Sequence, residues 1–490
     1  MSSFAPTVEE EEGSSPKLAW QEGEEFFPEI SAIPYEGADS LNPLAFKQYN
    51  ASEVINGKTM EEWCRFGVCF WHTFRGKGSD PFGAPTMTRP WDDESDSLEN
   101  AFRRVRAAFE FMTKLNVKYY TFHDRDVAPE GKTIEESNAN LDAVADLLEK
   151  MQQETGIKLL WSTQNLFSHP RYMNGGSTNP DSHVFAWAAS QAKKILEVNH
   201  RLGGENVVFW GGREGYQSVL NTDVKREIDH LAQFFKMCLA CTYNRFARPC
   251  VKLYGCALTP PFFLSSSFSL LTDRNKIGST AQFLIEPKPR EPTKHQYDYD
   301  AQTVIGFLHT YGLQNDFKLN IEPNHTTLAG HDYEHDILMA SKFGMLGSVD
   351  ANTGDPLLGW DTDMFPSDIK KTTLTMKIVM EQGGLAPGGL NFDCKVRRES
   401  TELRDMFIAH VGAMDAFARG LRNAAKILND NKMPAMVAER YSSFDSGLGK
   451  KIEDGEATLE DCEEFVKANG EPTQRSGRAE EYEMLMNHYV

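Results

Sequence analysis

Side chains that can bind metal ions or transfer protons recur at one kind of position in this chain of 490 residues, the end of a short apolar run. The run 117–124 has His123 next to its last position, and Asp126 follows the run closely. Four later runs lead to a group of acids, one histidine and one lysine: Glu286, Lys288, Glu322, His325, Asp350, Asp361, Asp363 and Asp393. If the ends of these runs meet in space, six carboxylates and an imidazole share one site.

Such a cluster of carboxylates requires cations, because neighbouring negative charges repel each other and raise each other's pKa. Oxygen ligands with a single imidazole are typical of Mg²⁺, Mn²⁺ or Co²⁺ sites. The set is too large for one octahedral ion that also binds water or substrate, so we predict two ions that share a bridging carboxylate. Helix capping is the commoner role of any one such acid. Capping does not explain acids or a histidine at four successive run ends.

The pair His123 and Asp126 in "FHDRD" is suited to proton transfer, because a carboxylate fixes the tautomer of a neighbouring imidazole and raises its pKa. An equally good interpretation is that Asp126 caps a helix. Lys288 stands between two prolines in "IEPKP", which keep it near Glu286 and suit it to polarise a substrate oxygen. The alternative is a surface lysine paired with an acid.

The elements that must position these residues alternate between short β-branched or aromatic runs and amphipathic stretches. Helical spacing of apolar residues is clear in 98–115 and 182–202. The eight strand-like runs are 66–74, 117–124, 157–163, 207–212, 282–287, 317–323, 346–352 and 389–394. Alternating strands and helices predict an α/β fold with a parallel sheet, and eight units favour a (β/α)8 TIM barrel over an open doubly wound sheet. Active sites of such barrels lie at the carboxyl ends of the strands, where all these candidate residues fall.

Two tryptophans, Trp161 and Trp210, stand at the ends of intervening strands. Tryptophan is usually a core residue, but at the rim of a barrel an indole can form a wall against the C–H face of a sugar.

Composition excludes several classes of protein. Hydrophobic residues make up 40% and charged residues 25% of the chain, as in ordinary globular proteins. No apolar run has the length of a membrane helix. A net charge of −20 disfavours binding to nucleic acid. Apart from one CxxC pair, Cys238 and Cys241, the eight cysteines show no zinc spacing. The N-terminus is acidic rather than signal-like, so we expect a cytoplasmic protein.

Sequence patterns divide the chain into an acidic N-terminal tail (1–40), a barrel (41–397) and a helical C-terminal arm (398–490). The apolar faces of this arm must pack against the barrel or a second subunit, so we expect oligomerisation. The segment 241–272 interrupts a helical pattern, contains no Asp or Glu and holds three of the eight cysteines. We interpret it as a translated intron or another gene-model artefact, the alternatives being a lineage-specific surface loop or a partner-binding element.

Nine segments from roughly residue 40 to the C-terminus form a recognisable series. They are "FWHTF", "FHDRDVAPEG", "LFSHPRYMNGGSTNPD", "FWGGREGY", "FLIEPKPREPTKHQYDYD", "NIEPNHTTLAGH", "DANTGDPLLGWDTDMFP", "GGLNFDCKVRR" and "ERYSSFDSGLG". Together they resemble xylose isomerase of the longer, class II type. The resemblance implies a homotetrameric aldose–ketose isomerase with two divalent cations per subunit, Mg²⁺ or alternatively Mn²⁺ or Co²⁺.

The resemblance also assigns roles to residues. The first metal site would consist of Glu286, Glu322, Asp350 and Asp393, and the second of Glu322, His325, Asp361 and Asp363. His123 and Asp126 would open the sugar ring, and Lys288 would contact O1 of the sugar. The pocket would be lined by Trp161, Thr163, Val208 and Trp210, with Phe82 from a neighbouring subunit. Gln164 departs from the family pattern, in which a small residue is usual, and this puts the edge of the pocket in doubt.

The implied reaction converts D-xylose to D-xylulose, and D-glucose to D-fructose less efficiently, by ring opening and a metal-assisted hydride shift between C2 and C1. An enediol route needs a free carboxylate base, and every candidate carboxylate is already assigned to metal. Two other functions are possible for such a chain. A nuclease of the endonuclease IV type would need more histidines and a basic surface, and a catalytically inactive relative would not need all these ligand positions filled.

Overall fold

The computed structural model describes residues 7–9, 17–19, 25–242 and 277–490, which fall into two compact units. The first unit comprises Met1–Pro34, Arg65–Phe365 and Leu385–His410, and the second comprises Tyr35–Cys64, Pro366–Gly384 and Val411–Val490. The predicted division into tail, barrel and arm stays a prediction. The predicted insertion 241–272 lies outside the described residues, except for its first two positions.

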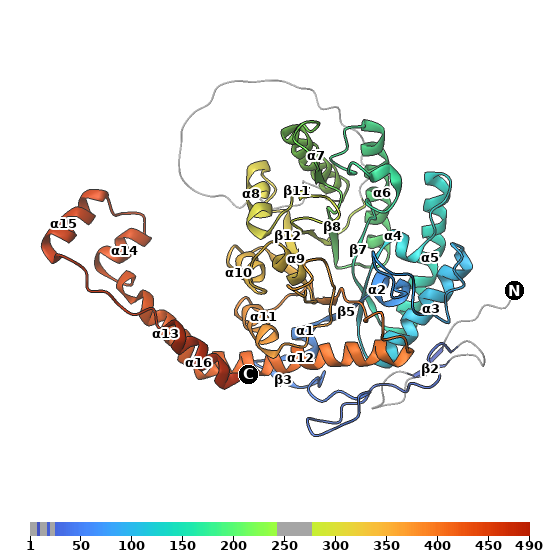
Figure 1. The fold of residues 1–490 in the computed structure, drawn as a ribbon, viewed down its shortest axis with the longest axis horizontal. Coiled ribbons are helices and arrows are strands. Elements are labelled where there is room, and N and C mark those ends of the chain that lie inside the picture. Colours follow the sequence, from blue (N-terminus) through green and yellow to red (C-terminus); the bar gives the residue numbers. More distant parts are fainter. Residues whose placement is uncertain (1–6, 10–16, 20–24, 243–276) are drawn as a thin grey trace. The chain divides into compact units, whose positions relative to one another are not determined.

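The first unit is built on a closed barrel of eight parallel strands (Figure 1). The strands are β5 (Phe66–Cys69), β6 (Tyr119–His123), β7 (Lys158–Thr163), β8 (Asn206–Trp210), β10 (Gln282–Glu286), β12 (Phe317–Ile321), β13 (Leu346–Asp350) and β14 (Leu390–Phe392). Each strand pairs with its neighbours in chain order, and β14 pairs with β5 to close the ring. The predicted (β/α)8 barrel is therefore confirmed, with each strand inside its predicted run or within one residue of it.

Helices lie around these strands. In the first unit the main ones are α3 (Leu98–Leu115), α5 (Ile134–Thr155), α6 (Ser182–Arg201), α7 (Val224–Thr242), α8 (Ala301–Tyr311) and α10 (His335–Lys342). The limits of α3 follow from its sequence. The Ser97 hydroxyl accepts the backbone N–H of Asn100 at its start, and Asn116 adopts a left-handed conformation (φ 58°) at its end. The apolar residues of α3 are buried at helical spacing, which orients this helix on the barrel.

Aromatic packing joins α7 to the outside of the barrel. The ring centroids of Phe235 and Phe209 lie 5.3 Å apart, and those of Phe235 and Phe317 lie 5.0 Å apart. Phe283 completes the group at 5.2 Å from Phe209. Each buried Phe contributes roughly 1.5–3 kcal/mol relative to an exposed one, so this layer fixes the position of β8 and β10.

The amino end of the barrel is closed by Arg65, which has a positive φ of 43°. Its guanidinium donates to the carbonyl of Gly388 at 2.6 Å and to the hydroxyl of Tyr119 at 2.7 Å, and it pairs with Glu205. These contacts connect the starts of several strands. The opposite, carboxyl end of the barrel is left for the site.

The chain leaves the described residues after α7 on this amino-terminal side. It returns at Ile277, whose backbone N–H donates to the carbonyl of Cys241 at 3.1 Å. The strand β10 begins five residues later, so the two ends of the undescribed segment meet at the side of the barrel opposite to the site.

The second unit is mainly helical. It contains β3 (Val54–Ile55), β4 (Lys58–Thr59), α1 (Met60–Cys64), α11 (Ile369–Glu381), most of α12 (Leu403–Asp430), α13 (Lys432–Tyr441), α14 (Gly447–Glu453), α15 (Leu459–Asn469) and α16 (Ala479–Tyr489). Within this unit, the Asp415 carboxylate accepts the backbone N–H groups of Lys47, Gln48 and Tyr49 at 2.8–2.9 Å. Helices α13, α14 and α15 have no buried residues.

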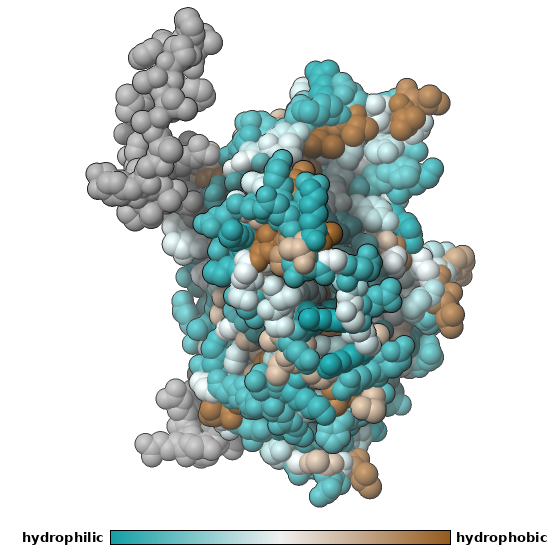
Figure 2. Space-filling model, turned by 90° about the vertical axis from the view of Figure 1, so that its left-hand side faces the viewer, coloured by the Kyte–Doolittle hydropathy of each residue, from teal (hydrophilic) through white to brown (hydrophobic). Residues whose placement is uncertain are grey.

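Hydrophilic residues predominate on the face drawn in Figure 2, where hydrophobic residues form small separate groups rather than one continuous patch. Among the helices of the described residues, none combines the length and the apolar character needed to cross a membrane.

Candidate active site

A cavity of about 200 Å³ opens at the carboxyl ends of the barrel strands. Its lining comprises Trp71, His72, His123, Trp161, Thr163, Phe167, Val208, Trp210, Glu286, Lys288, Glu322, His325, Asp361, Asp363 and Asp393. Twelve of these fifteen residues were candidates from the sequence. The lining acids come from β10, from the residues directly after β12 and β14, and from the loop after β13. These strands are consecutive in the barrel, so acids lie on one side of the cavity and aromatic residues on the other.

Glu322 lies at the centre of the acidic side. It belongs to three groups of side chains whose ligand atoms lie within 4.8 Å of one another. These groups are Glu286, Glu322 and His325; Glu322, Asp350 and Asp393; and Glu322, Asp361 and Asp363. A carboxylate shared in this way can bridge two cations.

Burial and mutual repulsion perturb the acids on this side. Burial, followed by the charges of Asp350 and Asp393, raises the pKa of Glu286 well above its usual range. Burial and then Asp361 do the same to the pKa of Glu322. Burial, with Asp393 as the next cause, raises the pKa of Asp350 to about 7. Without a metal ion, buried acids with raised pKa values hold protons. A divalent ion that binds to them displaces these protons.

Three asparagines hold the carboxylates in place. The side-chain amide of Asn320 donates to Glu286 at 2.9 Å and to Asp350 at 2.8 Å. The amide of Asn391 donates to Asp350 at 2.7 Å, and that of Asn352 donates to Glu322 at 2.7 Å. Neutral amides orient the carboxylates without neutralising them, so the negative charge stays available for metal ions.

His325 is oriented for metal binding by the backbone. Its Nδ1 lies 3.0 Å from the carbonyl oxygen of Pro287, which can only accept, so Nδ1 carries the proton. The other nitrogen, Nε2, therefore presents a lone pair. It lies 3.1 Å from Glu322 and 3.2 Å from Asp361. A backbone acceptor that fixes the tautomer is a recurring feature of histidine ligands to metals.

Lys288 is buried rather than on the surface, and its Nζ lies 2.5 Å from Oδ2 of Asp361. Burial alone would lower the pKa of Lys288, but the negative charges of Asp361 and Glu322 outweigh burial and raise it. Burial alone would raise the pKa of Asp361, but the charge of Lys288 holds it well below its usual range. A charged ammonium is thus fixed beside the acids, 5.3 Å from the centre of the Trp210 ring.

His123 and Asp126 satisfy both interpretations of their motif. Oδ2 of Asp126 accepts the backbone N–H of His123 at 2.7 Å, as in a capping box. The same oxygen lies 2.8 Å from Nδ1 of the His123 ring. Burial would lower the pKa of His123, but the charge of Asp126 outweighs burial and raises it. Asp126 therefore fixes the orientation of the imidazole through Nδ1.

Aromatic residues form the opposite wall. Trp71 packs edge to face on His123 at 4.6 Å, and Phe167 packs on Trp210 at 4.5 Å. The indole N–H groups of Trp161 and Trp210 and the hydroxyl of Thr163 are buried, and within the described part of the chain they have no hydrogen-bond partner. All three residues line the cavity, together with Val208. Apolar faces with a few polar atoms left free suit a polyhydroxylated ligand.

Asp126, which holds Nδ1 of His123, is one of four residues singled out from the sequence that do not line this cavity. Asp350 lies beneath it, fully buried among the asparagines. Phe82 is 80% exposed, and the centroid of its ring lies 5.5 Å from that of Trp360. Gln164 is buried beside the cavity and lines a separate, smaller cavity of about 30 Å³ behind Trp210.

Several residues of the site were missed by reasoning from the sequence. His72 lies 3.0 Å from Asp363 and 3.1 Å from Asp393, which outweigh its burial and raise its pKa to about 9. Trp71 donates to Asp393 at 2.7 Å, and Lys395 pairs with Asp363 at 2.9 Å. The signal for His72 was its position in "FWHTF", directly after the first strand at the same rim.

Comparisons with known proteins agree with this geometry. The chain is 52% identical over 461 residues to the xylose isomerase of Arabidopsis thaliana, covering 94% of this chain and 90% of that protein. It is also 52% identical over 465 residues to the xylose isomerase of Rhodopirellula baltica, covering 95% of this chain and 99% of that protein. The chain belongs to the xylose isomerase family.

Two further similarities involve parts of this xylose isomerase family member. The XylA2 C-terminal domain family matches residues 437–490, which include α14, α15 and α16. Among solved structures, a D-psicose 3-epimerase from Clostridium cellulolyticum H10 aligns at 12% identity with a TM-score of 0.44, covering 73% of this chain and 99% of that one.

Proposed function

We propose that this protein converts D-xylose to D-xylulose and, less efficiently, D-glucose to D-fructose. The observation that carries the proposal is the two-sided cavity, with clustered carboxylates facing aromatic side chains. Its setting in a chain about half identical to xylose isomerases over nearly its full length supports the same activity.

The donor set fits two divalent cations, Mg²⁺ or alternatively Mn²⁺ or Co²⁺, because oxygen donors predominate and the acids would otherwise repel each other. We assign the first ion to Glu286, Glu322, Asp350 and Asp393, and the second to Glu322, His325, Asp361 and Asp363. When bound, the two ions would supply Lewis-acid polarisation of the sugar oxygens at C1 and C2. The three-fold membership of Glu322 in the groups within 4.8 Å supports its bridging position.

Ring opening is assigned to His123 with Asp126. Asp126 holds Nδ1, which leaves Nε2 to move a proton between the O1 hydroxyl and the ring oxygen of the sugar. Since His123 packs against Trp71 and Phe167, its ring cannot turn away easily, and water has little access to it.

Isomerisation of the open chain is assigned to a hydride shift between C2 and C1. Lys288 would donate to O1 of the sugar and stabilise the charge that develops there. Trp161, Thr163, Val208 and Trp210 would hold the carbon chain against the acidic side. Because the clustered carboxylates all belong to the proposed ligand set, none is left as the base that an enediol route requires.

We also propose a homotetramer in the cytoplasm, in which Phe82 closes the pocket of a neighbouring subunit. The high exposure of Phe82 and the absence of buried residues in α13, α14 and α15 support contacts with other subunits. Apolar side chains at Val437, Ile452 and Phe465 are exposed in the single chain and would be covered in such an assembly.

The test is an assay of purified protein on D-xylose after removal of metal with a chelator. Activity should be absent in excess chelator and should return with Mg²⁺, Mn²⁺ or Co²⁺. D-xylose deuterated at C2 separates the two routes, since a hydride shift retains the label at C1 of D-xylulose and an enediol exchanges it with water. Full activity in excess chelator would remove the metal assignment, and a washed-out label would remove the hydride shift.

A further inference from the structure

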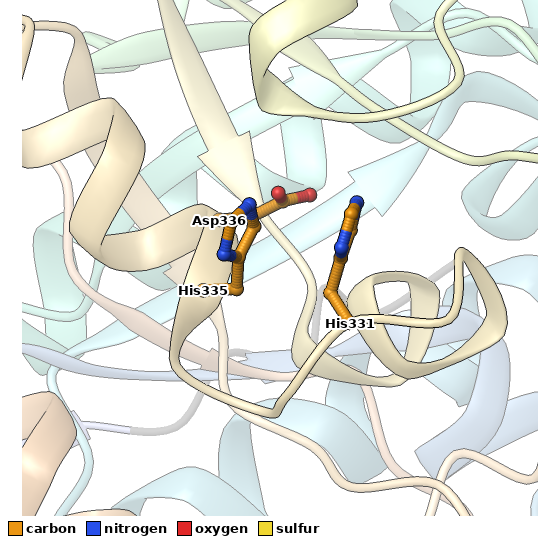
Figure 3. Close-up of side chains that lie close together, drawn as sticks. All are labelled: His331, His335 and Asp336. Atoms are coloured by element: carbon orange, nitrogen blue, oxygen red, sulfur yellow. The ribbon is translucent and has the colours of Figure 1, made fainter.

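A second group of potential metal ligands lies outside the candidate active site and consists of His331, His335 and Asp336, here called the two-histidine cluster. His331 is in the turn between α9 (Pro323–Leu328) and α10, and the other two residues are in the first turn of α10. The ring centroids of the two histidines lie 4.2 Å apart. Figure 3 shows the Asp336 carboxylate pointing toward the space between the two imidazoles. One nitrogen from each ring and one carboxylate oxygen lie within 4.8 Å of one another.

Two atoms of the cluster are buried and have no hydrogen-bond partner among the residues that the structure describes. Asp336 is only 3% exposed, and its Oδ2 accepts the backbone N–H of Ala301 at 3.3 Å while its Oδ1 has no partner. Nε2 of His335 is likewise buried and without a partner. A buried carboxylate oxygen without a donor is destabilising, and a bound cation would satisfy it.

A fourth donor stands next to the cluster. Oδ2 of Asp300 lies 3.1 Å from Nε2 of His331, while Oδ1 of Asp300 accepts the backbone N–H of Thr303 and caps α8. The His331 side chain is 27% exposed, which leaves the cluster open to solvent on one side. An ion could therefore enter without unfolding of the surrounding helices.

The donor chemistry differs from that of the candidate active site. Two imidazoles with one or two carboxylates are the ligands of Zn²⁺, Ni²⁺ and Cu²⁺, whereas Mg²⁺ prefers a shell of oxygens. We propose that the two-histidine cluster binds one such transition-metal dication. The stacked rings must turn about their Cβ–Cγ bonds for both lone pairs to meet the ion. The bound ion would connect both α10 and the turn after α9 to the start of α8.

The proposal can be tested with Ni²⁺ on untagged full-length protein that is first stripped of metal and then saturated with Mg²⁺. After addition of Ni²⁺ and gel filtration in Mg²⁺ buffer, the wild type should retain one Ni²⁺ per chain more than the His335→Gln variant. A His309→Gln variant, which removes an exposed histidine of α8 outside the cluster, should retain as much as the wild type. Any Ni²⁺ that replaces Mg²⁺ in the active site cancels in this comparison.

Binding of Cu²⁺ gives a second measurement, whose result would not depend on His335 if this residue had only a structural role. Electron paramagnetic resonance should show hyperfine splitting from two nitrogens in the wild type and the loss of this signal in the His335→Gln variant. If that variant folds poorly, His331→Gln should lose the same equivalent of metal, since the His331 side chain is partly exposed. Equal Ni²⁺ retention in the wild type and the folded variant would overturn the proposal.

Discussion

The substitution Glu322→Gln changes one atom at the centre of the proposed metal centre. The Gln side-chain oxygen can replace the Glu322 oxygen that accepts from Asn352 at 2.7 Å. The new amide group then takes the position of the oxygen that lies 3.1 Å from Nε2 of His325. It can donate to that nitrogen, so the fold has a satisfied arrangement without metal, while the bridging charge is lost.

The expected magnitudes follow from the spacing. Two carboxylates within 4.8 Å repel each other by at least about 3.5 kcal/mol at an effective dielectric constant near 20, and Glu322 has several such neighbours. Part of this repulsion is already relieved by bound protons, so the metal-free variant should melt a few degrees above the metal-free wild type. With Mg²⁺ the order should reverse, since removal of a direct ligand costs at least about 100-fold in metal affinity, or roughly 3 kcal/mol.

Two assays measure these effects. Thermal melting with and without Mg²⁺ should show a large Mg²⁺-dependent gain in Tm for the wild type and little for Glu322→Gln. The turnover number on D-xylose at saturating Mg²⁺ should fall by about 1,000-fold, or roughly 4 kcal/mol. The matched control is His123→Asn, which leaves the acids intact and should lose much less turnover, because ring opening also proceeds without catalysis.

Equal losses of turnover in Glu322→Gln and His123→Asn would refute this division of roles. A metal-free Glu322→Gln protein that melts below the metal-free wild type would show that the acids are not mutually repulsive in the absence of ions.

Three further outcomes are expected. The gain in Tm on adding Mg²⁺ should grow as the pH rises from 6 to 8. The pKa of Asp350 is raised to about 7, so its contribution to the stability of the chelated protein is complete near pH 4 and is lost as the pH rises through 7. A Mg²⁺-dependent gain in Tm that shrinks between pH 6 and pH 8 would contradict the assignment. Thr163→Val should raise KM for D-xylose about threefold to tenfold, from the loss of one hydrogen bond of about 1 kcal/mol. Tm should not fall, because the Thr163 hydroxyl has no partner among the described residues, and an unchanged KM would place the sugar elsewhere. Replacing residues 243–276 by a short Gly-Ser linker should leave isomerase activity intact, because Ile277 and Cys241 are hydrogen-bonded across the gap. A soluble but inactive variant would show that the segment is needed for activity.

The sequence predicts the barrel well because each strand is marked at both ends. Apolar runs of five or so residues stop at polar or aromatic residues, and the helices between them carry clear caps such as Ser97. The same marks predict most of the site, since the carboxyl ends of parallel strands in a closed barrel must meet at one rim. Chain order alone therefore places Glu286, Glu322 and Asp393 together.

What the sequence does not reveal is how the acids are held and balanced before metal binds. Asn320 and Asn391 lie within mainly apolar strands, and an asparagine there gives no indication that its side chain faces the carboxylates rather than marking a bulge or an edge. His72 follows a strand that ends in a cysteine, so its role depends on the first turn of a helix directing its ring at two acids of distant loops. These contacts depend on the directions of side chains and on the arrangement of the loops over the barrel. A periodic pattern in the sequence contains neither kind of information. The contacts of these asparagines and of His72 are also the ones most easily disturbed without loss of the fold, because the barrel itself is held by apolar packing such as that of Phe235 against Phe209. Substitutions of the asparagines should therefore reduce the affinity for metal ions much more strongly than they reduce the cooperativity of unfolding.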